Sequence, residues 1–326
     1  MALITFREAL NQAMDEEMAR DDKVFLLGEE VAEYNGAYKV SKGLLDKYGP
    51  HRVVDTPIAE LGFTGLAVGA ATAGLRPIVE WMTFNFGLLA LDQLVNNAAK
   101  LRHMSGGQLS VPMVVRGPNG PAEYLSSQHS QSFASYFAHI PGLKVVAPST
   151  PYDGKGLLKS AIRDNNPVIF LEAEMMYGFQ GEVPAEEYLL PLDKADIKRE
   201  GTDVTLITFG KPVQMALEAA KALEAQGVSA EVVDLISLRP LDEVTVYQSV
   251  RKTNRAVVID EAWPIASVGS HLAFLISSNC FDDLDAPVEF IASEDVPMPY
   301  NHTLELAVQP SVEKIVTAAK KVLYLN

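Results

Sequence analysis

Short apolar runs alternate with longer amphipathic segments along almost the whole chain. The short runs have the length of β-strands, and the longer segments repeat their apolar residues at helical spacing. Such strict alternation predicts parallel sheets covered by helices on both faces, so the expected fold class is α/β. In the second half the pattern predicts strands at 204–209, 230–235, 255–260 and 288–292 and helices at 213–225, 242–252, 267–278 and 311–323.

The first half of the chain follows the same alternation. Thr5 and Glu8 form a capping box that predicts a helix over 5–20. The segment 116–120 contains two glycines and a proline, which predicts an irregular loop. A helix over 87–104 is expected to bury one face, formed by Leu88, Leu91, Val95 and Ala98. The remaining elements are strands at 24–27, 53–55, 78–81, 111–115, 144–147 and 168–172, a loop with a short helix at 35–49 and a helix at 153–163.

The periodic pattern is interrupted once, over residues 178–195, where glycines and prolines occur without regular spacing. We interpret this stretch as a linker. A chain of 326 residues also exceeds the size at which one core usually keeps growing. The sequence therefore predicts two doubly wound parallel-sheet domains, residues 1–177 and 196–326.

The helix after the strand at 53–55 is the centre of the first half. Thr56 and Pro57 are expected to open it, as N-cap and first-turn residues, and Gly74 to end it. Glu60 then lies in the opening turn, where the helix dipole favours a carboxylate. The helix also contains Gly62, Gly65 and Gly69, each costing about 1 kcal/mol relative to alanine, so a closely packed neighbouring helix, from this or another subunit, is expected.

Two further places carry polar side chains suited to chemistry. Glu29 and Glu30 follow the strand at 24–27 and could line the mouth of a pocket, although solvation of a turn explains them equally well. His129 follows a strand and its loop, and its near-neutral pKa in solution suits proton transfer. Many histidines in such loops are only structural.

Composition limits the kinds of partner and the cellular compartment that we expect. The formal charge of −15 argues against nucleic acid or an anionic membrane as partner and allows a basic protein partner. The single Cys280 excludes an internal disulfide framework. Neither a signal peptide nor a long apolar span is evident, so we expect the cytoplasm of a bacterium, or the mitochondrial matrix or plastid stroma if the chain is processed.

Several kinds of chemistry lack their motifs in this sequence. The histidines are not at metal-ligand spacing, and the sequence contains neither a Walker-type loop nor a G-x-G-x-x-G or G-x-S-x-G motif. Glu60 and His129 remain the best polar candidates. By themselves they do not identify a reaction.

Five motifs resemble one known family. They are Asp55 to Glu60 (DTPIAE), Glu80 to Phe86 (EWMTFNF), Arg116 to Gly120 (RGPNG), Gln128 to Gln131 (QHSQ) and Asp295 to Tyr300 (DVPMPY). In this order they resemble the β subunits of the decarboxylating component of pyruvate dehydrogenase, which are thiamine-diphosphate proteins of the transketolase-like group. The resemblance covers essentially the whole chain. It implies a pyrimidine-binding domain followed by a transketolase C-terminal domain.

The resemblance also implies roles for individual residues. Glu60 would hydrogen-bond the ring nitrogen of the cofactor's aminopyrimidine, and His129 would handle protons or guide lipoyl transfer. Phe86 would stack on the aminopyrimidine, with Ile58 and Met82 beside it. Without the resemblance, these three would be taken as core residues. Glu29 would lie near the channel between paired active sites.

Cofactors and partners follow from the resemblance as well. The family holds diphosphate and magnesium with a GDG motif of a separate α subunit, and this sequence has no GDG. The chain would then be half of an active site in a heterotetramer of two α and two β subunits. The family's potassium site maps onto Met113, Ala161, Ile162, Asp164 and Asn166, and docking of the lipoyl-bearing acetyltransferase maps near Asp282, Asp283, Asp285 and Asp295.

The implied activity is decarboxylation of pyruvate with reductive acetylation of the lipoyl group. A branched-chain 2-oxoacid dehydrogenase or an acetoin dehydrogenase would use the same chemistry with a different pocket. A non-catalytic scaffold that only pairs α subunits is the alternative from another class.

Overall fold

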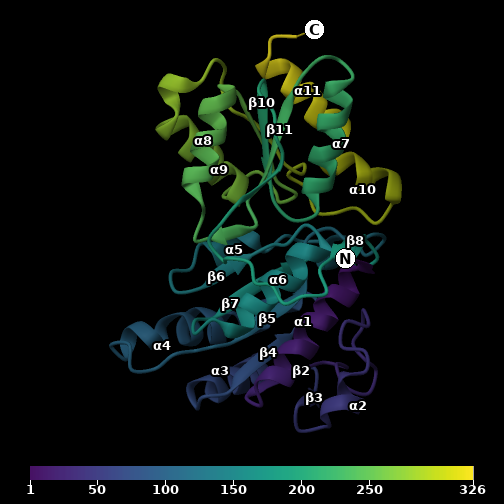
Figure 1. Cartoon of the computed structure of the whole chain (residues 1–326), viewed down its shortest axis with the longest axis vertical. Helices are drawn as coiled ribbons and strands as arrows, with labels where there is room; N and C mark the ends of the chain where they lie inside the picture. Colours follow the sequence, from purple (N-terminus) through teal and green to yellow (C-terminus); the bar gives the residue numbers. More distant parts are fainter. Residues whose placement is uncertain (326) are drawn as a thin grey trace. The chain divides into compact units, whose positions relative to one another are not determined.

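The computed structural model describes residues 1–325, and the chain divides into two compact units (Figure 1). Unit 1 contains residues 1–119 and 136–192, and unit 2 contains residues 120–135 and 193–325. This division differs from the expected boundaries, because residues 120–135 group with the second half and residues 178–192 with the first. None of the helices within residues 1–325 is long and apolar enough to cross a membrane.

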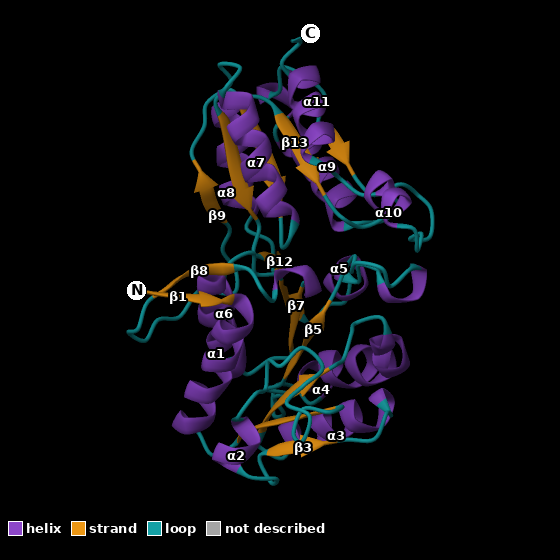
Figure 2. Cartoon of the chain, turned by 90° about the vertical axis from the view of Figure 1, so that its right-hand side faces the viewer, coloured by secondary structure: helices purple, strands orange, loops and turns teal. Residues whose placement is uncertain are grey.

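Unit 1 is built on a parallel sheet with the strand order β6-β7-β5-β4-β2-β3. Figure 2 draws strands in orange and labels β3, β5 and β7 of this sheet. Its strands are almost entirely buried, as expected for a sheet with both faces covered. The strands are β2 (Val24–Gly28), β3 (Val53–Asp55), β4 (Arg76–Glu80), β5 (Val114–Pro118), β6 (Lys144–Val146) and β7 (Val168–Glu172). The helices are α1 (Phe6–Arg20), α2 (Leu44–Tyr48), α3 (Glu60–Thr72), α4 (Ala99–Met104) and α6 (Pro151–Arg163), and α5 (Ala134–Ala138) spans the boundary at residue 135.

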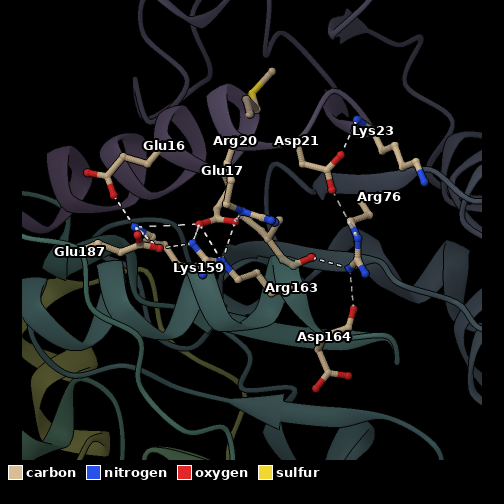
Figure 3. Close-up of polar contacts among 12 residues, drawn as sticks. Glu16, Glu17, Arg20, Asp21, Lys23, Arg76, Lys159, Arg163, Asp164 and Glu187 are labelled. Carbon is tan, nitrogen blue, oxygen red and sulfur yellow. Dashed lines mark hydrogen bonds and ion pairs between the residues drawn. The ribbon is translucent and has the colours of Figure 1, made fainter.

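Helices α1 and α6 pack side by side, and a network of charged side chains joins them (Figure 3). Glu17 of α1 is fully buried and accepts hydrogen bonds from Arg20 and from Arg163 of α6. Lys159 of α6 is also buried and donates to Glu16. A buried carboxylate is tolerated only when it is paired in this way. The network therefore fixes the register of the two helices.

Unit 2 contains a five-stranded sheet with the order β14-β13-β10-β11-β9. Four strands are parallel, but β9 pairs antiparallel with β11, so the expectation of a purely parallel sheet is wrong at this edge. The strands of this sheet are β9 (Asp196–Arg199), β10 (Val204–Thr208), β11 (Ala230–Asp234), β13 (Ala256–Ile259) and β14 (Glu289–Ile291), and the short strand β12 (Ser237–Arg239) lies outside it. The helices are α7 (Pro212–Glu224), α8 (Glu243–Thr253), α9 (Val268–Asn279), α10 (His302–Val308) and α11 (Val312–Val322).

The expected linker is partly a strand. β8 (Gln180–Val183) pairs antiparallel with β1 (Ala2–Thr5), which comes directly before the capping box of α1. The capping box itself is confirmed, because Thr5 and Glu8 bond each other reciprocally. Both strands are short and carry glycine or mixed residues, so neither shows the alternation that predicts a strand.

The helix expected over 87–104 is irregular. It consists of a 3-10 turn (Phe86–Ala90), a π-helical turn (Gln93–Ala98) and α4. A Cβ atom at Gly87 would overlap the ring of Trp81, so this close approach fixes how the segment begins. The irregular turns shift the buried face, so Ala90 and Leu94 are buried whereas Leu88 is exposed.

The expected loop at Arg116 is part of strand β5. The Arg116 side chain is buried and donates to Glu80 at the end of β4 and to Glu172 at the end of β7. Tyr177 donates to the same Glu172 carboxylate over 2.6 Å. Burial raises the pKa of Glu80, and the adjacent Arg116 guanidinium opposes this rise. The glycines and the proline predicted a loop here. The ion pairs that hold the strand join residues distant in sequence, so the local pattern does not reveal them.

We predict that replacing Arg116 with methionine lowers the free energy of unfolding by about 3–5 kcal/mol, because Glu80 and Glu172 would stay buried without a counter-charge. Urea denaturation of the purified chain measures this change. The control is the triple variant Arg116→Met, Glu80→Gln, Glu172→Gln, which should recover most of the loss. A triple variant as unstable as the single one would show that packing, not charge, causes the effect.

Candidate active site

Two carboxyl groups meet at one edge of the unit 1 sheet. Glu29 directly follows β2, and Glu60 is the first residue of α3, which follows the neighbouring strand β3. The carboxyl ends of parallel strands share one edge of a sheet, where open α/β folds place their binding sites. Only 4% of Glu29 and 3% of Glu60 is exposed. Burial, and then the adjacent Glu60 carboxylate, raises the pKa of Glu29 to about 7.

Helix α3 opens at Glu60, so the expectation that Thr56 and Pro57 begin it is wrong. The amide of Thr56 donates to the Gly28 carbonyl and so extends the pairing of β2 with β3. Ala59 is the N-cap residue and supplies no side-chain cap. Glu60 therefore occupies the first helical position, where the free amides and the dipole favour a carboxylate.

Several polar atoms at this edge are buried without a hydrogen-bond partner among residues 1–325. They are Oε1 of Glu29, Oε2 of Glu60 and Oγ1 of Thr56. Leaving a buried polar group unsatisfied costs about 1–3 kcal/mol, more for a charged one. The Glu60 carboxylate also lies close enough to raise the pKa of Glu29. An arrangement this costly is typical of a site that a ligand completes.

The predicted apolar residues Ile58, Met82 and Phe86 do not form a closed core. Ile58 is 82% exposed, and Met82 and Phe86 are half-buried. The 3-10 turn that begins at Phe86 packs against α3. Simple core packing is therefore a poor explanation of Ile58. An exposed apolar side chain beside buried acids fits the wall of a binding site better.

His129 lies in a 3-10 turn of unit 2, Ser127–His129, and is half-buried. The structure thus places it in a different unit from Glu29 and Glu60. Its role stays a prediction that rests on the resemblance.

The residues expected to bind potassium gather where α6 ends. Arg76 donates to the carbonyl oxygens of Ile162 and Asp164 at 2.9 and 3.0 Å, and the Asp164 carboxylate accepts from Asn166. The carbonyl oxygens of Met113 and Ala161 accept backbone amides. A carbonyl oxygen has two lone pairs, so each retains capacity for a cation. Figure 3 shows that the Arg76 guanidinium approaches Asp164.

Sequence reasoning missed the residues that support the site. The carboxylate of Asp55, at the end of β3, accepts the backbone amides of Ala32 and Glu33 and so holds the loop that follows Glu29. The Glu80, Arg116 and Glu172 cluster ties together the ends of three adjacent strands. The sequence feature that could have identified these supporting residues is a charged residue at or near the carboxyl end of each strand.

Two family models match the chain in series. The transketolase pyrimidine-binding domain matches residues 2–180, and the transketolase C-terminal domain matches residues 193–315. A solved structure described as a split gene transketolase, inactive beta4 tetramer, has the same fold, with a TM-score of 0.81, 25% identity and 99% of each chain covered. The fold and the edge site thus define a protein of the transketolase class.

Full-length relatives narrow the class further. The chain is 56% identical over 325 residues to the mitochondrial pyruvate dehydrogenase E1 component subunit beta-2 of Oryza sativa, covering 98% of this chain and 86% of the relative. It is 55% identical to the mitochondrial pyruvate dehydrogenase E1 component subunit beta of Caenorhabditis elegans, covering 98% of this chain and 92% of the relative. It is 54% identical to the pyruvate dehydrogenase E1 component subunit beta of Rickettsia conorii, covering 99% of both chains. The chain belongs to the family of pyruvate dehydrogenase E1 component β subunits.

We predict that Glu29→Gln stabilises the purified chain at pH 8 but not at pH 4. The folded-state pKa of about 7 lies above the ordinary 4.5, so the folded protein binds the proton more tightly and ionisation costs stability. The advantage of the variant should grow between pH 4.5 and 7 and stay constant above. Thermal unfolding across this range measures it.

The matched control for this experiment is Glu33→Gln, an exposed acid four residues away. Its effect on the unfolding temperature should not grow over the same pH range. Equal pH dependence of the two variants would contradict the buried carboxyl pair.

Proposed function

We propose that the chain is the β subunit of a thiamine-diphosphate-dependent 2-oxoacid dehydrogenase that decarboxylates pyruvate and reductively acetylates the lipoyl group of an acetyltransferase. The full-length relatives support the pyruvate activity over the branched-chain and acetoin alternatives. The observation that carries the catalytic assignment is the buried Glu29 and Glu60 pair, with an unpartnered oxygen on each acid.

Glu60 is the proposed catalytic acid. Its Oε2 atom is buried and lacks a partner within residues 1–325, so it is available to hold or share a proton with a ring nitrogen. Because the pKa of Glu29 is about 7, that group is partly protonated near neutral pH. When bound, thiamine diphosphate supplies the carbon nucleophile and the electron sink. Glu60 supplies the proton control.

The proposed wall beside Glu60 is apolar. Phe86 offers a ring face for stacking on the aminopyrimidine, and Met82 and Ile58 would exclude water around it. Exclusion of water strengthens the hydrogen bond between Glu60 and the ring nitrogen. When it is protonated, Glu29 would place no second negative charge beside Glu60.

The other half of the site is proposed to come from an α subunit, in a heterotetramer of two α and two β chains. The exposed side of α3 supports this: Leu61 and Leu66 project from it, and a Cβ atom at Gly69 would meet no atom within 4 Å. Such an apolar face with room for close backbone approach fits a second chain. The α subunit would hold magnesium and the diphosphate, and the compartment stays a prediction.

The acetyltransferase is proposed to dock on unit 2 near the expected acids. Asp283 and Asp285 already pair with Arg251 and Arg255 at 3.0 and 2.8 Å. Exposed Asp282 and Asp295 are therefore better placed than those two to attract a basic partner.

We predict that Glu60→Gln lowers the turnover of pyruvate by several orders of magnitude in the assembled heteromer, because an amide cannot share the proton that the ring nitrogen needs. The measurement is the rate of carbon dioxide release from pyruvate in the presence of thiamine diphosphate and magnesium. Glu33→Gln is the control and should keep full activity, since its side chain is exposed.

Two outcomes would contradict the proposal in different ways. Undiminished decarboxylation by Glu60→Gln would support a non-catalytic scaffold. Faster turnover of 2-oxoisovalerate than of pyruvate by the unsubstituted heteromer would assign a branched-chain activity while leaving the role of Glu60 intact.

We also propose that a potassium ion binds among the carbonyl oxygens at the end of α6. Potassium chloride should raise the unfolding temperature more than choline chloride at equal concentration, because only potassium can use these carbonyls. Asn166→Ala should reduce this difference, since its side chain bonds Asp164 at the site. Equal unfolding temperatures in the two salts would show that the Arg76 guanidinium alone fills the role.

A further inference from the structure

A cavity of about 710 Å³ lies in unit 1 between the start of α1 and the loop after β2. Its volume is within the range of small-molecule sites, roughly 300–1,000 Å³. None of the residues assigned above to the active site lines it. The lining consists of Thr5, Arg7, Glu8, Asn11, Tyr34, Asn35, Lys39, Lys42, Tyr177 and Gly178.

The charge of this cavity is opposite to that of the chain. Arg7, Lys39 and Lys42 face one acid, Glu8, in a protein whose net charge is −15. Glu8 is committed elsewhere, because its Oε2 atom accepts the amide and the hydroxyl of Thr5, both at 2.8 Å. The backbone amide of Thr5 is also the main cause that lowers the pKa of Glu8. The cavity therefore keeps an excess of positive charge.

Arg7 places a guanidinium at the wall of the cavity. Its backbone amide donates to the Tyr177 carbonyl, which fixes the residue there. Its Nε atom is buried, but the side chain as a whole is half-buried and lines the cavity. A guanidinium presents its donors in a planar fork that matches the oxygens of a phosphate or carboxylate. The part of the guanidinium open to the cavity is therefore suited to an oxyanion.

Two lysines and a tyrosine add ammonium donors and an aromatic surface to the cavity. Lys39 donates to the Tyr34 carbonyl at 2.6 Å and lies 3.1 Å above the Tyr34 ring, so its ammonium is held at the cavity rather than free in solvent. An ammonium group has three donors, so it can also reach a ligand. Lys42 is exposed and can adjust to ligands of different size. Tyr34 adds an aromatic surface for the organic part of a ligand.

We propose that this cavity binds a small organic phosphate, with Arg7 and Lys42 as its main phosphate contacts and Tyr34 against the organic part. The site lies outside the proposed catalytic centre. Its occupation needs no turnover, so the proposal does not depend on the activity of the enzyme.

The test is calorimetric titration of the assembled heteromer, saturated with thiamine diphosphate and magnesium so that the diphosphate site is filled. The probes are inorganic phosphate and glycerol 3-phosphate, at ionic strength matched with sodium chloride. Glycerol 3-phosphate should bind more tightly than inorganic phosphate. Arg7→Gln and Lys42→Gln should each weaken its binding about tenfold, the loss expected for one charged hydrogen bond.

Lys23→Gln is the matched control, because Lys23 is an exposed lysine of unit 1 that does not line the cavity. Binding by this variant should be unchanged. Lys42→Gln guards against misfolding of the Arg7 variant, since the Lys42 side chain is exposed.

Three outcomes would overturn the proposal. Equal weakening by all three variants would indicate only a general charge effect. Equal affinity for inorganic phosphate and glycerol 3-phosphate would show that the site binds the anion alone and does not recognise the organic part. Binding by the purified chain but not by the heteromer would mean that a partner chain covers the cavity.

Discussion

The carboxyl edge of the unit 1 sheet depends on one buried guanidinium. Arg116 lies between Glu80 and Glu172 and so connects the ends of β4, β5 and β7. An isolated charge could not stay in this interior, whereas a paired and hydrogen-bonded group can. Because the ion pairs act across strands, they hold the ends of β4 and β7 against β5. The segment that carries Met82 and Phe86 begins at the end of β4.

The same edge of the sheet also carries polar groups that the chain does not satisfy. The Arg116 cluster satisfies its charges within the chain, but Glu29 and Glu60 each leave an oxygen unsatisfied. Burial, and then the neighbouring Glu60 carboxylate, raises the pKa of Glu29 to about 7. The rigid, satisfied cluster supports the unsatisfied pair. This division between structural and functional charge is typical of sites that are preorganised for a ligand.

The sequence predicted the elements whose causes are local. The capping box at Thr5, the helices α7, α8, α9 and α11 and most of the buried strands follow from spacing that a short window reveals, whereas α10 was not predicted. Elements set by distant contacts were missed or misplaced. β5 continues through Arg116 because of carboxylates far away in sequence, and the segment after Gly87 is irregular because it packs on Trp81.

The candidate site shows the same limit. Glu60 was identifiable from its place at a helix start, and Glu29 from its place after a strand. That the two acids meet, and that Glu60 begins the helix itself, depends on the pairing of β2 with β3. The supporting role of Asp55 depends on a turn whose amides point back at it. These contacts form only in the tertiary structure, so the periodicity of apolar residues in the sequence does not predict them.

The incomplete acids and the exposed apolar face of α3 are best understood together. Glu60 begins the helix whose outer side carries Leu61 and Leu66, so the two features share one rigid element. A ligand that supplies the missing hydrogen bonds and a second chain that covers the apolar side would each stabilise the same position of α3. Binding of one then favours binding of the other, because each is relieved of the cost of fixing the helix. The unsatisfied acids and the exposed apolar side of α3 therefore give a physical reason for the chain to act in an assembly.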